Sequence, residues 1–263
     1  MLKFRATLIN TGIFSGNSMI SNEHSGIFIV IDGIDGAGKT TQVNLLAKQL
    51  QYAGETVVVS KEPTNGVWGK KIRETATTGR LPVAEELEAF LKDREEHIHT
   101  KILPNLEKGS VVIVDRYFYS TIAYQGIREI EDLQQLEVEV KQNALKPDAV
   151  FIIDIDPRIA AIRITDRDGQ PNEFEKLEDQ IKIREIFGML CNEDLSINVI
   201  DGNKTINDVN KDVATITVNG ILKQKRCYKD YGCDDQLNCG YRMTNTCIWS
   251  NMKDKILSAI KQA

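Results

Sequence analysis

The sequence predicts a three-layer α/β protein, in which a five-stranded parallel sheet carries helices on both faces. Short apolar runs rich in β-branched residues predict the strands, at 27–31, 56–60, 111–114, 149–155 and 197–200. Helical patterns lie between and after them, at 68–75, 84–106, 120–125, 132–145, from 157 onward and at 206–222. Strands that alternate with helices form parallel sheets, which bind ligands beyond the carboxyl ends of their strands.

Length and composition indicate one substantial domain with a small appendage. The chain has 263 residues, of which 41% are hydrophobic and 27% are charged. A net charge of −5 lacks the basic footprint of a nucleic-acid binder, so we expect no nucleic-acid partner. No apolar run approaches the length of a membrane span, so we expect no membrane partner. Five cysteines do not make a disulfide-dense scaffold, which favours a reducing, cytoplasmic location.

The chain divides into three predicted parts. Residues 1–24 are expected to form a disordered extension, residues 25–225 the α/β domain, and residues 226–263 an appendage of unknown role. The appendage contains Cys227, Cys233, Cys239 and Cys247, separated by five, five and seven residues, unlike the paired ligands of common zinc sites. Two interpretations stay open: a structural zinc or iron–sulfur site held by four thiolates, or a subdomain with free thiols.

The strongest motif follows the first strand. Residues 33–40 read GIDGAGKT, which matches G-x-x-x-x-G-K-[ST] with a strand before and a helix after. The glycines let the loop turn its N–H groups inward, and the helix N-terminus adds positive charge, which suits a phosphate chain. We favour this phosphate-binding P-loop over a simple glycine-rich turn because the full motif stands in the right context. The predicted ATP-binding residues are Gly33, Ile34, Asp35, Gly36, Ala37, Gly38, Lys39, Thr40 and Thr41.

Two polar residues follow the third predicted strand. Asp115 ends a buried run, and its carboxylate together with the Thr40 hydroxyl is predicted to hold Mg²⁺. Arg116 beside it can bind a phosphate through two parallel hydrogen bonds. The alternative is an aspartate that caps a helix next to a solvent-facing arginine.

Residues 163–175, RITDRDGQPNEFE, predict a hinged lid, called the LID below. The segment begins on a helix, breaks near Gly169 and Pro171, and resumes as a helix. Arg163 and Arg167 would then close over ATP and neutralise charge on the transferring phosphoryl group. The alternative is an exposed loop with solvated charges.

Several motifs, in order, resemble the thymidylate kinase family. They are IDGIDGAGKTTQ, KEPTNGVWGKKIRE, FLKDREEHI, GSVVIVDRYFYSTIAYQG and KPDAVFIIDIDP, and the resemblance covers about residues 26–225. It implies a P-loop NTPase fold and the ATP-dependent phosphorylation of dTMP to dTDP in dTTP biosynthesis, with Mg²⁺ as cofactor. It also implies a homodimer, with the helix that contains Phe90 near the interface.

The resemblance also implies an acceptor site, position by position. Asp35 would approach the 3′-hydroxyl, Phe90 would stack on thymine, Arg94 would contact a thymine carbonyl, and Arg116 would hold the monophosphate. Residues i and i+4 share a helix face, so Phe90 and Arg94 can address one base. Without the resemblance, Phe90 would be interpreted as core. The other implied dTMP-binding residues are Ser120, Thr121, Tyr124 and Gln125, with Tyr124 excluding a 2′-hydroxyl.

Some members of the family carry a catalytic arginine in the P-loop, directly after the aspartate. Here that position is Gly36, so the resemblance implies that the LID supplies the arginine. The implied catalytic residues are Lys39, Asp35, Arg163 and Arg167. Two segments depart from the pattern of bacterial members. The LID reads DRDGQPNEFE where R-G-x-x-D-R-F-E is frequent, and residues 61–65 read KEPTN where R-E-P-G-G-T is frequent.

Two other functions stay open at this point. The chain could be a P-loop kinase for another nucleotide or deoxynucleotide, or an ATP-binding regulatory module that is not a kinase. Phe90, Arg94 and Arg116 discriminate between a kinase and a regulatory module, because an ATP switch needs no acceptor site.

Overall fold

A computed structural model gives the fold of the chain. It describes residues 19–128, 130, 132–142, 144–168, 177–228, 254–256 and 258, without the side chains of 167–168 and 223–228. Residues 1–18, the central part of the predicted LID and most of the appendage lie outside this description.

The predicted parallel sheet is confirmed. Its five strands lie in the order β2-β3-β1-β4-β5, and each neighbouring pair is parallel. The strands are β1 (Ile27–Asp32), β2 (Val57–Lys61), β3 (Val111–Asp115), β4 (Ala149–Asp154) and β5 (Ile197–Asp201). Every residue of β1 and β3 is buried, as expected for central strands covered on both faces. The register places Ile31 of β1 beside Asp115 of β3, so both strands end at the same edge.

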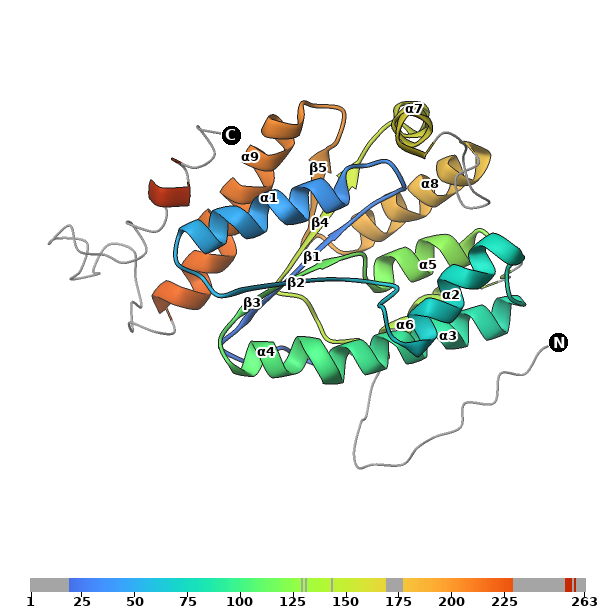
Figure 1. The fold of residues 1–263 in the computed structure, drawn as a ribbon, viewed down its shortest axis with the longest axis horizontal. Helices are drawn as coiled ribbons and strands as arrows, with labels where there is room; N and C mark the ends of the chain where they lie inside the picture. Colours follow the sequence, from blue (N-terminus) through green and yellow to red (C-terminus); the bar gives the residue numbers. More distant parts are fainter. Residues whose placement is uncertain are drawn as a thin grey trace, which may run out of the picture.

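Helices cover the two faces of this sheet. Figure 1 shows α1 and α9 together on one side, with α4, α3, α5 and α6 on the other. The described helices are α1 (Lys39–Tyr52), α2 (Val67–Thr78), α3 (Val83–His97), η1 (Ile98–Ile102), α4 (Leu103–Glu107), α5 (Phe118–Gly126), α6 (Leu133–Lys141), α7 (Pro157–Asp168), α8 (Leu177–Glu193), α9 (Ile206–Ile216) and η2 (Thr217–Tyr228). The core lies between the layers and joins the strands to the inward faces of α1, α5, α8 and α9. This arrangement is the predicted three-layer fold.

The helix predicted over 84–106 differs in one respect. The structure has three segments there, because a π-helical turn, η1, separates α3 from α4. Ile98, Ile102 and Leu106 are all buried, and their spacing of four residues fits an α-helix or a π-helix. The apolar pattern alone therefore could not reveal the π turn. Such turns are rare and occur frequently at functional sites.

Both ends of the described chain contact the domain. Ile20 forms an isolated bridge with Leu145, with backbone hydrogen bonds of 2.9 Å to the Ala144 carbonyl and 2.8 Å from the Lys146 N–H. Ile256, in the segment predicted as an appendage, is fully buried in the core. Within the described residues, no helix combines the length and the apolar character that a membrane span requires.

Candidate active site

The P-loop connects β1 to α1 at the carboxyl edge of the sheet. Its backbone takes positive φ at Gly36 (78°) and at Gly38 (93°), the residue before α1. A Cβ on Gly36 would lie 2.5 Å from the Ala160 carbonyl oxygen of α7, so only glycine fits there. The loop is thus pressed against α7, and the predicted ATP-binding residues 33–41 form this loop and the first turn of α1.

Lys39, which is predicted to bind phosphate, is buried against the P-loop. Its side chain is 6% exposed, and Nζ donates a 2.7 Å hydrogen bond to the Ile34 carbonyl. Burial lowers the pKa of the Lys39 ammonium to about 8, and the positive charge of Arg116 acts in the same direction. Asp35, Asp115 and Asp32 oppose the shift. A phosphate chain would supply the negative charge that keeps this ammonium protonated.

Thr40 and Asp115 meet where magnesium is predicted. Thr40 Oγ1 donates a 2.5 Å hydrogen bond to Asp115 Oδ2, although the two residues are far apart in sequence. Asp115 Oδ1 is buried and has no hydrogen-bond partner in the described part of the chain. A buried carboxylate oxygen without a partner, beside a hydroxyl, is a donor set that suits Mg²⁺. These two residues therefore fit the ion that the sequence motif implies.

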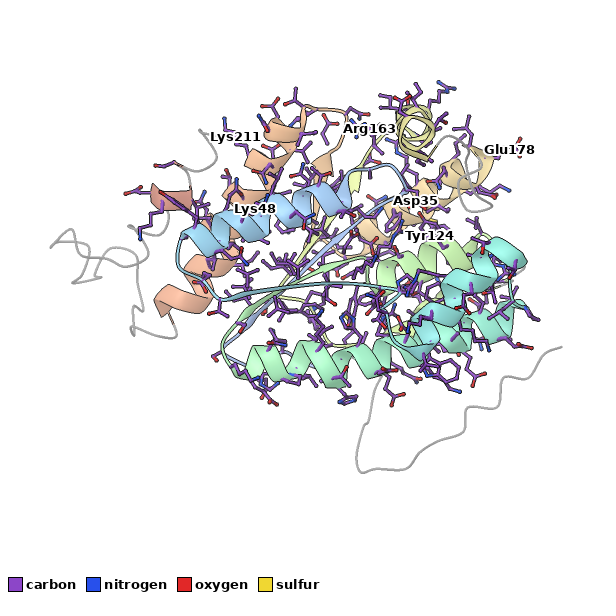
Figure 2. All side chains as sticks on the ribbon, viewed as in Figure 1. Asp35, Lys48, Tyr124, Arg163, Glu178 and Lys211 are labelled. Atoms are coloured by element: carbon purple, nitrogen blue, oxygen red, sulfur yellow. The ribbon has the colours of Figure 1, made fainter. Side chains whose placement is uncertain are left out.

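A second cluster joins the P-loop to α5. Arg116 Nη2 donates a short hydrogen bond to Asp35 Oδ1, and Nη1 donates to Ser120 Oγ at 3.0 Å. Tyr124 OH donates to Asp35 Oδ2 at 2.9 Å, and its ring centroid lies 5.0 Å from the Arg116 guanidinium. Figure 2 shows Asp35 and Tyr124 close together between the P-loop and α5. Arg116 is also the one described non-glycine residue with positive φ (67°), a backbone state that concentrates at functional sites.

Sequence reasoning missed the residue that holds this cluster in place. Asp32 is fully buried at the end of β1 and accepts N–H bonds from Tyr117 (3.1 Å) and Ser120 (3.0 Å). Asp32 also accepts a hydrogen bond of 2.6 Å from the Ser120 hydroxyl. The Ser120 hydroxyl, predicted to bind dTMP, therefore already donates to Asp32 and accepts from Arg116. Burial raises the pKa of the Asp32 carboxyl, although the positive charge of Arg116 acts to lower it. The sequence feature that could have indicated this role is the position of Asp32, a carboxylate at the end of an apolar strand and directly before the P-loop.

The predicted base-binding residues lie on one face of α3. Phe90 is half-buried and stands outside the hydrophobic core cluster, whereas its neighbour Leu91 packs against that cluster. Arg94, one turn later, is 3% exposed, and its Nη1 is buried without a hydrogen-bond partner among the described residues. A partly exposed ring on the same helix face as a buried donor without a partner suits a flat heterocycle that carries a carbonyl group.

Thr121 and Gln125 of α5 face the same region. Thr121 Oγ1 accepts a 2.7 Å hydrogen bond from Arg94 Nη2. Gln125 is fully buried, and its Nε2 donates to Glu86 Oε2 at 2.9 Å. Its Oε1 is buried without a partner in the described residues, so it could accept from a ligand. The structure thus brings Thr121, Tyr124 and Gln125 to one face of α5, as the acceptor assignment requires.

The LID residues are placed only in part. Arg163 lies on α7, where its Nη2 donates a 3.3 Å hydrogen bond to the Gly202 carbonyl after β5. Arg167 lies within α7, but its side chain and residues 169–176 are outside the described residues. The predicted helix–break–helix pattern is consistent with α7 ending at Asp168 and α8 beginning at Leu177.

The side chains of the predicted zinc ligands lie outside the described part of the chain. Cys233, Cys239 and Cys247 lie outside the described residues, as does the side chain of Cys227. Within the described part of the chain, no group of three His, Cys, Asp or Glu side chains could hold a metal ion. The zinc site therefore stays a prediction without support.

Comparison with known proteins identifies the family. The family model described as thymidylate kinase matches residues 31–213, from the end of β1 into α9. The chain belongs to the thymidylate kinase family. Thymidylate kinase of Xanthomonas oryzae pv. oryzae (strain PXO99A) is 46% identical over 165 residues, which are 63% of this chain and 72% of the relative. Thymidylate kinase of Xylella fastidiosa (strain M12) is 44% identical over 162 residues, or 62% and 74% of the two chains.

Family membership identifies the protein as a phosphotransferase and confirms the resemblance inferred from the motifs. The family match includes the P-loop, the cluster of Asp35, Arg116, Ser120 and Tyr124, and Arg163, and it ends before η2. The segment with four cysteines lies beyond it, so the family match gives that segment no function.

Proposed function

We propose that the protein transfers the γ-phosphoryl group of ATP to dTMP and yields ADP and dTDP. The observation that carries this proposal is the acceptor side of the site. Phe90 is left out of the core, and Arg94, which lies four residues later on the same helix, keeps a buried nitrogen without a partner. A module that only binds or hydrolyses ATP needs neither feature. The names of the similar proteins from Xanthomonas and Xylella agree with dTMP as the acceptor.

The chemistry follows from charge and placement. A phosphate oxygen of dTMP attacks the γ-phosphorus, and the bond from that phosphorus to the β–γ bridging oxygen breaks. Lys39 neutralises the β- and γ-phosphates from the P-loop, and Arg116 holds the acceptor phosphate. Asp35 and Tyr124, which are joined by a hydrogen bond of 2.9 Å, would together form one side of the sugar site. Such transfers depend on alignment and electrostatic stabilisation more than on a general base.

Mg²⁺ is the proposed cofactor, held by Thr40 and Asp115. When bound, it would neutralise charge on the phosphate oxygens of ATP. Arg163 and Arg167 are the proposed LID arginines. They would reach the phosphates by moving from the conformation in which Arg163 contacts Gly202. We further propose a cytoplasmic homodimer with α3 near its interface, as the family resemblance implies.

The test is ADP formation by purified protein with ATP, Mg²⁺ and one nucleoside monophosphate at a time. The proposal predicts turnover with dTMP at least about tenfold above that with dCMP, dAMP or dGMP, because a pocket built around one base rejects others by such factors. ADP formation that is the same with and without dTMP would favour a regulatory ATPase. A preference for another monophosphate would favour a different nucleotide kinase.

A further inference from the structure

Glu62 is a buried carboxylate to which the sequence assigned no role. It follows β2 directly and is 5% exposed. Its Oε2 accepts two hydrogen bonds from Arg94, at 3.0 Å from Nε and 2.9 Å from Nη2. Its Oε1 lies 3.0 Å from His97 Nδ1, and His97 Nε2 lies 2.7 Å from Ser60 Oγ. Burial alone would raise the pKa of Glu62, but Arg94 and His97 outweigh it and hold the pKa below its ordinary value.

The loop that carries Glu62 is itself fastened to α3. Asp93 accepts the Thr64 N–H at 2.7 Å and the Thr64 hydroxyl at 2.6 Å. Asp93 and Arg94 are adjacent, so neighbouring residues of α3 hold both ends of the segment 62–64. Glu62 is therefore a fixed support rather than a mobile surface carboxylate.

The contacts of Arg94 leave one nitrogen uncommitted. A guanidinium has N–H donors on Nε, Nη1 and Nη2 and has no acceptor. Glu62 occupies Nε and one side of Nη2, and Thr121 accepts from Nη2 at 2.7 Å. The Tyr117 ring lies 5.1 Å from the guanidinium carbon and restricts the plane of the group. Nη1 is the nitrogen that remains buried and without a partner among the described residues.

We propose that Glu62 is a positioning residue for base selection: its bridge to Nε and Nη2 fixes the Arg94 guanidinium so that Nη1 alone is presented to the acceptor base. This proposal rests on the proposed function, in which Arg94 contacts a carbonyl of thymine. An N–H donor held in one orientation can donate to a base that has a carbonyl oxygen at that place. It disfavours a base that has an amino group there, because two donors would then face each other. Thymine and cytosine share a carbonyl at ring carbon 2, but at ring carbon 4 thymine has a carbonyl and cytosine has an amino group. In this proposal Nη1 meets the substituent at carbon 4, so Glu62 sets the preference for dTMP over dCMP.

The competing explanation is a structural ion pair. Buried carboxylates that bridge an arginine and a histidine are costly to break whatever they do for a ligand. The two explanations differ in one measurable quantity, the ratio of kcat/KM for dTMP to kcat/KM for dCMP. If Glu62 is purely structural, its substitution changes kcat/KM for dTMP and for dCMP by the same factor. If Glu62 positions Arg94, its substitution changes the ratio of the two values.

The experiment is a double-mutant cycle on that ratio, with ATP saturating. The variants are Glu62→Gln, Arg94→Lys and the double substitution, and Glu95→Gln is the control because Glu95 is an exposed carboxylate on the same helix. We expect Glu62→Gln to lower the ratio about tenfold or more and Arg94→Lys to lower it similarly, because each removes a fixed donor. The double variant should show no further loss, and Glu95→Gln should keep the wild-type ratio.

Several outcomes would overturn the proposal. One is a folded Glu62→Gln variant with the wild-type ratio, and another is a double variant whose loss is the product of the two single losses. If Glu62→Gln does not fold, Glu62→Asp keeps the charge but is one methylene short, and its ratio should fall at least about threefold. An unchanged ratio in Glu62→Asp would also overturn the proposal. Wild-type protein without dTMP-dependent turnover would instead overturn the proposed function, and this inference with it.

Discussion

The proposed acceptor wall and the proposed donor wall of the site are built in different ways. On the acceptor wall, Glu62, Asp93, Arg94 and His97 are buried and joined to one another or to neighbouring segments by hydrogen bonds of 2.6–3.0 Å. On the donor wall, Arg163 is exposed and its described hydrogen bond, to Gly202, is 3.3 Å long. The acceptor site is therefore preorganised, whereas the donor-side arginine is held weakly.

Because of this difference, substitutions in the two walls should change different kinetic constants. A preorganised acceptor wall lowers the entropy lost when dTMP binds, so changes there should appear mainly in KM. An arginine that joins the phosphates only on closure contributes in the transition state, so changes there should appear mainly in kcat. Substitutions in the P-loop and in the two walls should differ in the size of their effect and in the kinetic constant that they change.

The largest effect is expected at Lys39, which is buried in the P-loop. Lys39→Ala removes the buried cation at the β- and γ-phosphates, and we expect kcat to fall about 10³-fold, a loss typical of electrostatic groups at a reacting centre. Steady-state ADP formation measures it. Lys48→Ala is the matched control, since Lys48 is exposed on the same helix, α1 (Figure 2). Near-normal turnover in Lys39→Ala would reject the P-loop assignment.

The next effect concerns the donor wall. Arg163→Ala should lower kcat about 100-fold, because one transition-state donor is lost, with KM for dTMP and the thermal midpoint almost unchanged. Arg158→Ala, an exposed arginine on α7, is the control. A rise in KM for dTMP with normal kcat would mean that Arg163 serves binding, and the contrast between the walls would fail.

The acceptor wall gives a smaller effect of the opposite kind. Phe90→Ala should raise KM for dTMP about 30-fold and leave KM for ATP within about twofold, because stacking of one base on a ring contributes 1–3 kcal/mol. Tyr52→Ala, which removes a ring that is 67% exposed on α1, is the control. Equal increases in both KM values, together with a lower thermal midpoint, would place Phe90 in the core instead.

The smallest expected effect is a pH dependence of ATP binding. The pKa of Lys39 is lowered from 10.5 to about 8 in the free protein, so its ammonium loses its proton as pH rises through that value. Because phosphate binding requires the ammonium, ATP affinity should fall about tenfold between about pH 7 and about pH 9. Equilibrium binding of ATP to wild type and to Lys39→Ala measures this. A slope that persists in Lys39→Ala would assign the dependence to another group.

The sequence predicted the sheet and the P-loop because both have local signals. Apolar runs mark β1 and β3, and the spacing of Gly33, Gly38 and Lys39 marks the loop. Asp32 and Glu62 were missed because their roles depend on partners that are remote in sequence. Asp32 binds the start of α5, and Glu62 binds Arg94 on α3. Neither hydrophobic periodicity nor a local sequence motif indicates such pairings. The acceptor residues were predicted from the resemblance to a family, since Phe90 alone fits a core pattern equally well.

Phosphoryl transfer to dTMP can be followed directly in a ³¹P NMR spectrum of wild-type protein incubated with equimolar ATP and dTMP and with excess Mg²⁺. We expect the resonances of ADP and dTDP to grow at equal rates while inorganic phosphate stays near its background. If inorganic phosphate accumulated with ADP while the dTMP resonance stayed constant, the chain would bind and hydrolyse ATP without an acceptor. The central claim, an acceptor site preorganised for dTMP, would then be wrong.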